Sequence, residues 1–251
     1  MSESIKLISY NIWQGTYLDA LLAFLDKEKP DILCLQEVGT SGIGQKQSSD
    51  NLFKMICDAM RMEGDYENMF WADEGVGRFD SGVAILSRFT RTNRMIFRYE
   101  RITDDILRLT DRDRYFVPRV LLGNELLIDN KSLWVFTTHF TISPDAKVTQ
   151  HQLDNAYAVA EQLQKYPEYV LCGDLNTPHG SQVFDMLRGD ALDVIGPNYP
   201  TLHPKLHRVG HLALQVDHAF VRSDRVTVTS SAVPIADGSD HLPLVIEFTL
   251  R

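Results

Sequence analysis

The stretch from Tyr169 to Pro178 constrains the fold of this chain most. Its first four residues, Tyr169–Cys172, are apolar and predict a short buried strand. In extended backbone Asp174 and Asn176 project to the same side, because they are two residues apart. Pro178 has no N–H group for a β-ladder, so the strand is expected to end before it. The stretch therefore predicts a carboxylate and a carboxamide at the end of a rigid strand, although Asp and Asn are also common turn residues.

Strand and helix patterns alternate along the rest of the chain. The strand–helix–strand order at the start predicts a crossover unit. Ser143 and Pro144 predict a helix start, with serine as the N-cap and proline at the first helical position. No linker rich in Pro, Gly or Ser divides the chain, so residues 1–251 are expected to form a single domain. Strands are predicted at 4–13, 32–35, 66–71, 82–86, 95–99, 116–122, 125–128, 133–138, 169–172, 216–221, 226–228 and 244–248, helices at 18–25 and 52–60, and the buried stripe of the third helix at Leu153, Ala156, Tyr157, Ala160 and Leu163.

Composition indicates an ordinary globular protein, with 44% apolar and 24% charged residues. No apolar run is long enough to span a membrane, so no integral membrane segment is expected. Residues 1–6 lack a basic segment followed by an apolar one, so no secretory signal is expected. The cysteines (Cys34, Cys57 and Cys172) are scattered, which fits a reducing compartment and predicts a cytoplasmic protein. The oligomeric state is left open, with a monomer expected.

The net charge of −9 disfavours loose, sequence-independent binding of nucleic acid. From Arg78 to Arg119, however, ten arginines and six acids give a local net charge of +4. Arginine's planar guanidinium suits phosphate. A salt-bridged outer surface is the favoured interpretation of this segment, and a substrate patch is the alternative.

Polar side chains lie beside apolar runs at several predicted strand ends, and together they indicate a catalytic or metal-binding site. An acid in a strand, such as Asp217, is rarely buried without a partner. Oxygen donors and histidines without a thiolate cluster suit Mg²⁺ or Mn²⁺ rather than zinc, and such a metal suits phosphoryl chemistry. The candidate residues are Asn11, Glu37, His139, Asp174, Asn176, Asp217, Asp240 and His241.

Three further histidines, His203, His207 and His211, are spaced by four residues. Pro204 and Gly210 would interrupt any helix that aligned them, so they are not expected to form a metal site. Because they lie between the Asp174 and Asp217 motifs, a loop over the substrate is one interpretation. No phosphate-binding Gly-x4-Gly-Lys-Ser/Thr loop and no Gly-x-Ser-x-Gly elbow occurs.

The ordered motifs resemble those of the endonuclease/exonuclease/phosphatase superfamily, the group of DNase I, exonuclease III, neutral sphingomyelinases and inositol polyphosphate phosphatases. The resemblance implies a four-layer αββα sandwich of the α/β (α+β) class, with two mixed β-sheets face to face and helices outside. The segment after Asn176 differs from the inositol phosphatase pattern. The Thr138-His139 pair is more similar to the corresponding motif of the DNases or sphingomyelinases. The motifs that carry the resemblance are Ser9–Ile12, Leu35–Val38, Ser81–Ser87, Thr138–Phe140, Gly173–Asn176, Val216–His218 and Ser239–Pro243.

The resemblance also implies roles. Glu37 would be the principal metal ligand, assisted by Asn11 and Asp240 directly or through water. Asp174 would orient or deprotonate the attacking water, and Asn176 would hold that water or a phosphate oxygen. His241, oriented by Asp217, would contact the scissile phosphate, and His139 would be a second acid/base or phosphate contact.

The expected function is thus a Mg²⁺- or Mn²⁺-dependent phosphoester hydrolase, foremost a phosphodiesterase. Its substrate would be a small or lipid-headgroup phosphodiester, or nucleic acid. The alternatives are a phosphomonoesterase using the same site and a non-catalytic binding protein on this fold.

Overall fold

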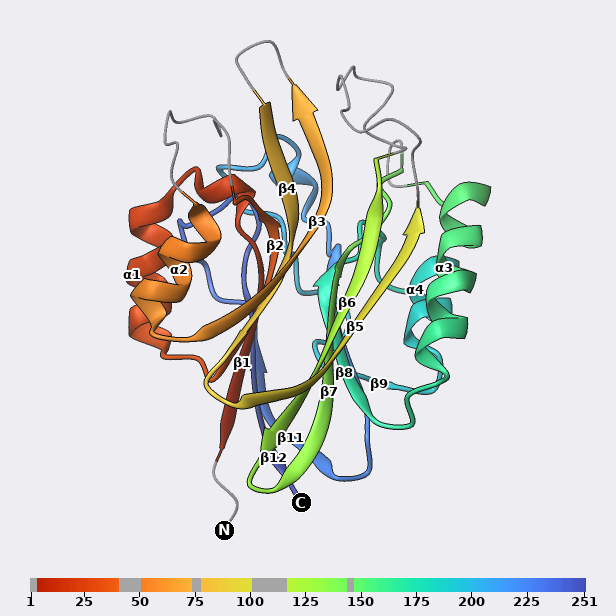
Figure 1. The fold of residues 1–251 in the computed structure, drawn as a ribbon. Helices are drawn as coiled ribbons and strands as arrows, with labels where there is room; N and C mark the ends of the chain where they lie inside the picture. Colours follow the sequence, from red (N-terminus) through yellow and green to blue (C-terminus); the bar gives the residue numbers. More distant parts are fainter. Residues whose placement is uncertain (1–3, 41–50, 74–77, 101–116, 144–146) are drawn as a thin grey trace.

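The computed structural model describes residues 4–40, 51–73, 78–100, 117–143 and 147–251, which form two six-stranded mixed β-sheets with helices outside them (Figure 1). The first sheet has the order β11 (Val226–Ala232), β12 (Leu244–Leu250), β1 (Ile5–Asn11), β2 (Ile32–Val38), β4 (Arg78–Ser87) and β3 (Glu63–Asp73). The second has the order β5 (Thr90–Glu100), β6 (Arg119–Ile128), β7 (Lys131–His139), β8 (Tyr169–Asp174), β10 (Asp217–Arg222) and β9 (Leu192–Asp193). The helices are α1 (Leu18–Glu28), α2 (Leu52–Met60), α3 (Gln150–Leu163) and α4 (Gln182–Arg188).

Three apolar clusters separate four layers, which confirms the predicted sandwich. Alternate residues of each central strand face opposite ways. In β1, Leu7 packs between the two sheets, whereas Ile8 and Tyr10 pack under α1 and α2. In β8, Val170 points between the sheets and Leu171 packs under α3 and α4. Because both faces of these strands are covered, they appear in the sequence as continuous apolar runs. The single-domain organisation stays a prediction.

Strand register determines which polar side chains meet. In the parallel pair of β7 and β8, His139 lies opposite Asp174. In the antiparallel pair of β10 and β8, Asp217 also lies opposite Asp174. The ends of three neighbouring strands of the second sheet therefore carry one group of polar residues. In the first sheet, the ends of β1 and β2 place Asn11 opposite Gln36, directly before Glu37.

The third helix begins later than predicted. It starts at Gln150, and its N-cap is Thr149, whose side chain accepts a hydrogen bond from the N–H of Gln152. Ser143 lies before the helix in irregular backbone, so the predicted N-cap was wrong, and Pro144 lies outside the described residues. Tyr157 was wrongly placed in the buried stripe, because it is 65% exposed.

Other boundaries differ less. The predicted strands at 116–122 and 125–128 form the single strand β6 from Arg119. Neither α4 nor the two-residue β9 was predicted, although Ser181 supplies a typical N-cap for α4 by accepting from the N–H of Phe184. The predicted loop at 39–50 and the charged region at 101–114 lie mostly outside the described residues.

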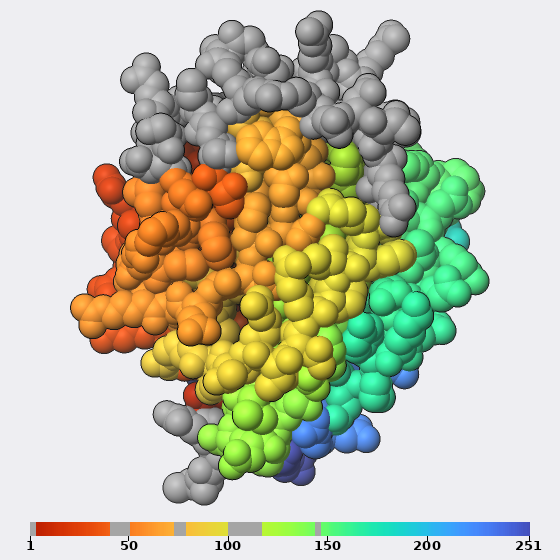
Figure 2. Space-filling view, viewed as in Figure 1, coloured from red at the N-terminus to blue at the C-terminus, as the bar shows by residue number. Residues whose placement is uncertain are grey.

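Arginines of β5 join the outer edges of the two sheets. Arg94 donates through Nε to both carboxylate oxygens of Asp65 in β3, at 2.9 and 2.8 Å, and Arg91 forms an ion pair with the same carboxylate at 3.0 Å. Glu67 of β3 forms ion pairs with Arg94 and Arg98. Figure 2 shows β3 (orange) and β5 (yellow) side by side on one face. These contacts agree with the favoured interpretation of a salt-bridged surface, and the arginines between 101 and 114 lie outside the described residues.

Among the described residues, no helix combines the length and apolar character needed to cross a membrane.

Gly173 allows β7 and β8 to approach closely just before Asp174. A Cβ atom at this position would lie 2.1 Å from the carbonyl oxygen of Thr138, and the backbone φ is +154°. The clash cannot be relieved by moving a flexible side chain, because the obstructing atom belongs to the backbone of the neighbouring strand. The positive φ is a second constraint, since residues with a Cβ rarely adopt it.

We therefore expect Gly173→Ala to lower the free energy of unfolding by at least about 2 kcal/mol, through overpacking and backbone strain. Urea denaturation followed by circular dichroism measures the change. The control is Gly196→Ala, where φ is +70° but no atom lies within 4 Å of the added Cβ, so the loss should be near 1 kcal/mol. Equal losses in the two variants would contradict the view that the close approach of β7 and β8 makes Gly173 more sensitive to an added Cβ than Gly196.

Candidate functional site

Asp174 lies at the centre of the polar group on the second sheet. Its carboxylate is 2% exposed, and its Oδ1 accepts the backbone N–H of Asn176 at 2.9 Å. Its Oδ2 lies 3.4 Å from Nε2 of His139 and 3.7 Å from Nε2 of His241. Burial, with the neighbouring carboxylate of Asp217 as a smaller contribution, raises the pKa of Asp174 to about 6, although the charge of His241 opposes the shift.

Asn11 connects this group to the first sheet. Its Nδ2 donates to Oδ2 of Asp174 at 3.0 Å and to Oε1 of Glu37 at 3.2 Å. Its Oδ1 accepts the backbone N–H of Trp13 at 3.1 Å, which fixes the orientation of the carboxamide. Asn11 therefore presents nitrogen, not oxygen, to the two carboxylates, and it sets their separation.

Glu37 occupies strained backbone at the end of β2. Its φ is +55°, in the left-handed region that a residue with a Cβ rarely adopts. The strand has a bulge here, because the register against β4 shifts between Gln36 and Val38. A bulge re-aims a side chain, and here the carboxylate of Glu37 comes within hydrogen-bond distance of Asn11. Burial raises the pKa of Glu37, and nearby Asp174 adds to the shift.

His241 lies just before β12 and contacts the acids of the second sheet. Its Nδ1 is 2.9 Å from Oδ2 of Asp217, and both side chains are less than 10% exposed. The charges of Asp217 and Asp174 raise the pKa of His241 well above its usual value, although burial opposes the shift. Burial, with the nearby charge of Arg119, lowers the pKa of His139 well below its usual value. The pKa values of the two imidazoles near Asp174 are therefore shifted in opposite directions.

Asp240 lies next to His241, and Oγ of Ser239 approaches its Oδ1 at 3.4 Å. Burial raises the pKa of Asp240 to about 6. Several carboxylates with raised pKa values, gathered from both sheets, form a site that a bound cation would stabilise. Their oxygen donors fit a hard divalent ion. Among the described residues, two groups have donor atoms within 4.8 Å of one another: His207, Asp240 and His241, and Asp174, Asp217 and His241.

Asn176 does not adopt the predicted extended arrangement beside Asp174. Its φ is +48°, its backbone N–H closes a turn onto Asp174, and its Nδ2 donates to the carbonyl of Phe140 at 2.9 Å. The alternative interpretation of the Asp-x-Asn pair as a turn is therefore the one observed. Asn176 contacts Asp174 through its backbone, and its side chain fastens the loop after β8 to the end of β7.

Some residues in and around the site were not predicted from sequence. Gln36 is fully buried and donates to Oγ1 of Thr137 at 2.9 Å, which links the two sheets behind the site. Asp80 accepts from Tyr66 and Thr40, and thereby holds the segment that follows Glu37. An acid in a strand is the same signal that identified Asp217, and it could have identified Asp80.

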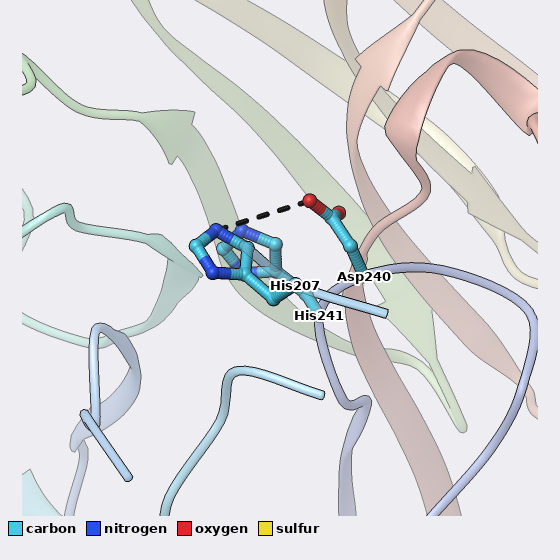
Figure 3. A group of neighbouring side chains, drawn as sticks. All are labelled: His207, Asp240 and His241. Carbon is cyan, nitrogen blue, oxygen red and sulfur yellow. Dashed lines mark ion pairs between the residues drawn. The ribbon is translucent and has the colours of Figure 1, made fainter. Parts of the chain in front are cut away.

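Of the other histidines, one reaches the site. His207 lies 3.8 Å through Nε2 from Oδ2 of Asp240, and its ring centroid is 5.6 Å from that of His241 (Figure 3). His203 instead pairs with Asp237, and His179 pairs with Asp193. His218 points away from Asp217, as strand alternation predicts, and its Nε2 contacts the carbonyl of Thr177.

Comparison with known structures supports the same fold. An endonuclease/exonuclease/phosphatase from Beutenbergia cavernae superposes with a TM-score of 0.75 at 18% identity, covering 98% of this chain and 72% of that one. The catalytic domain of human Nocturnin, solved with a bound sulfate anion, gives a TM-score of 0.70 at 17% identity, with 99% and 94% covered. A mannosyl-6-phosphatase from Bacteroides thetaiotaomicron gives 0.64 at 16% identity, with 98% and 100% covered.

A comparison by sequence with curated proteins gave no significant match. The sequence profile of the Endonuclease/Exonuclease/phosphatase family, however, matches residues 8–241, a span that begins in β1 and ends at His241. With the sandwich fold and the polar group described above, this match shows that the chain belongs to the endonuclease/exonuclease/phosphatase family.

Proposed function

We propose that this chain is a divalent-metal-dependent phosphoester hydrolase that prefers phosphodiesters. The observation that carries the proposal is the meeting of Asn11 and Glu37 of the first sheet with Asp174 and the Asp217–His241 pair. This arrangement combines acidic oxygen donors, a cationic imidazole and a carboxylate with a pKa of about 6 at one end of a rigid scaffold. Membership of the endonuclease/exonuclease/phosphatase family supports the same substrate class.

Glu37 and Asp240 would hold Mg²⁺ or Mn²⁺ through their carboxylate oxygens. Asn11 would space Glu37 from Asp174 through its Nδ2 donors, since its Oδ1 is already bonded to Trp13. The metal would act as a Lewis acid on the phosphate oxygens. The donor set fits such an ion, because it consists of partly buried carboxylates without a thiolate among them.

The protein's own groups would perform the remaining steps. Asp174 orients a water for in-line attack on the phosphorus atom and accepts its proton, a role for which a pKa near 6 is suitable. The bond from phosphorus to the leaving-group oxygen breaks on the side opposite the attacking water. His241, held by Asp217, donates a charge-assisted hydrogen bond to the phosphate as negative charge develops. His139, whose Nε2 lies 3.4 Å from the same carboxylate oxygen of Asp174, supplies a neutral imidazole to the substrate. Asn176 fixes the loop that carries Asp174.

We also propose that the protein acts in the cytoplasm as a single-domain monomer. All three cysteines are unpaired, and Cys34 and Cys172 are buried in the core, as expected for a reducing compartment. Nucleic acid is included in the proposed substrate class. It would be bound by contacts at the site, because the net charge of −9 does not attract the phosphate backbone to the protein surface in general.

Asp174→Asn should lower kcat at least about 100-fold on bis(p-nitrophenyl) phosphate in Mg²⁺ or Mn²⁺, because the amide cannot accept a proton. EDTA should abolish turnover by the wild type. p-Nitrophenyl phosphate, assayed in parallel, identifies a monoesterase if it is the better substrate.

The matched control is Asp190→Asn, which changes a 73% exposed carboxylate at the opposite end of the second sheet and should leave kcat unchanged. Turnover by the wild type that persists in EDTA would contradict the proposed metal dependence. Turnover that is equal in Asp174→Asn and wild type would contradict the role of Asp174.

Glu37→Gln should weaken Mn²⁺ binding at least about tenfold, because one anionic ligand is lost while the size of the side chain is retained. Electron paramagnetic resonance of free Mn²⁺ measures the affinity without any substrate. Glu63→Gln, at an exposed position in β3, is the control and should bind Mn²⁺ like the wild type. Unchanged Mn²⁺ affinity in Glu37→Gln would show that Glu37 is not a metal ligand.

A further inference from the structure

The segment from Thr201 to Leu214 is fastened to the residues that carry the site. The N–H of His203 donates to the carbonyl of Asp240 at 2.8 Å, and the N–H of Leu242 donates to the carbonyl of Thr201 at 2.6 Å. Oγ1 of Thr201 accepts the N–H of Asp217 at 3.1 Å. The segment therefore has a fixed position relative to Asp217 and Asp240, the two acids that it contacts.

The backbone around His207 is ordered by its own hydrogen bonds. The N–H of His207 donates to the carbonyl of His203 at 3.1 Å, and the N–H of Gly210 donates to the carbonyl of His207 at 3.0 Å. Gly210 packs so closely on His203 that a Cβ atom would lie 2.2 Å from the carbonyl oxygen of His203. A tight turn therefore fixes the backbone position of His207.

One hydrogen bond determines the tautomer of His207. The backbone N–H of Val209 donates to Nδ1 of His207 at 3.1 Å. A backbone N–H can only donate, so Nδ1 provides a lone pair, and the proton of the neutral ring is on Nε2. His207 therefore offers an N–H donor on its Nε2 side. Metal ligation through Nε2 would need the opposite tautomer and would cost the bond from Val209, so His207 is poorly suited to complete a metal site with Asp240 and His241.

The Nε2–H group points toward the site, and among the described residues it has no partner at bonding distance. Nε2 lies 3.8 Å from Oδ2 of Asp240, which is too far for a hydrogen bond. The His207 and His241 rings are nearly perpendicular, at 88°. As Figure 3 shows, His207 and Asp240 come from separate segments and face one another. The side chain of His207 is 21% exposed, so a bound molecule can reach it.

We propose that His207 is a substrate-binding residue that donates a hydrogen bond from Nε2 to a phosphate oxygen of the substrate. This inference rests on the proposed phosphoester function, and it adds a third imidazole that the family motifs do not include. His207 and His241 would bind phosphate oxygens from two directions, beside the carboxylate of Asp240. The Nε2–H group can bind such an oxygen without breaking a hydrogen bond within the protein, because Oδ2 of Asp240 lies 3.8 Å away.

The test measures binding of inorganic phosphate by isothermal titration calorimetry in saturating Mg²⁺. His207→Ala should raise Kd about tenfold or more, the effect of losing one hydrogen bond to a charged group. His207→Gln should restore most of the affinity, because the amide nitrogen of glutamine can occupy the place of Nε2. The control is His211→Ala, an exposed histidine four residues further along the same segment, and it should bind phosphate like the wild type.

Two companion measurements separate this inference from other roles. Mn²⁺ affinity should be the same in wild type and His207→Ala, and a loss of Mn²⁺ binding would overturn the inference by making His207 a metal ligand. Thermal unfolding of the two His207 variants should match the wild type, and equal phosphate affinity in folded His207→Ala and wild type would overturn it directly. If the wild type binds no phosphate and hydrolyses no phosphoester, the proposed function fails and this inference with it. Phosphate binding by the wild type that is insensitive to His207 overturns the inference alone.

Discussion

One hydrogen bond joins the two halves of the site. Nδ2 of Asn11, at the end of the first sheet, donates to Oδ2 of Asp174, at the end of the second, at 3.0 Å. The same nitrogen donates to Glu37, and the carboxamide is locked by the backbone of Trp13. The positions of the two carboxylates therefore depend on how the sheets pack, and the apolar cluster between the sheets determines that packing.

The scaffold and the chemistry have opposite requirements, and the chain reconciles them at strand ends. The sheets are stabilised by continuous apolar faces, in which an unpaired charge is costly. At the ends of β2, β7 and β8 and at the start of β10, polar groups collect where they can hydrogen-bond to one another. The left-handed backbone of Glu37 lies at this boundary, where strained conformations frequently mark functional sites. The raised pKa values of Asp174 and Asp240 have the same main cause, because loss of solvent around a buried or partly buried carboxylate disfavours its charged form.

Much of the fold followed from local patterns. Runs such as Ile32–Leu35 and Tyr169–Cys172 are apolar on both faces, and they became central strands covered on both sides. Errors arose where a local signal competed with tertiary context. Ser143-Pro144 is a good helix start by itself, but the helix begins at Gln150, after Thr149. Tyr157 fits a helical stripe by spacing, yet it faces solvent, whereas the polar Gln152 and Asn155 are buried by hydrogen bonds to the Thr141 region.

The sequence by itself determined the strands, their polar ends and the family resemblance, because alternation and apolar runs reflect burial that each segment needs wherever it packs. The sequence also marked His139, Asp174 and Asp217 as polar residues beside apolar runs, but the register of β7, β8 and β10 in the structure brought them together. Only the tertiary structure decided that Asn11 presents its nitrogen, that Asn176 closes a turn, and that His207 faces Asp240 with its proton on Nε2. The contacts of Asn11 with Asp174 and of His207 with Asp240 join residues far apart in the chain, so no local pattern encodes them. The turn at Asn176 was one of two local alternatives, and the bond from its side chain to the carbonyl of Phe140 is again a contact between distant segments.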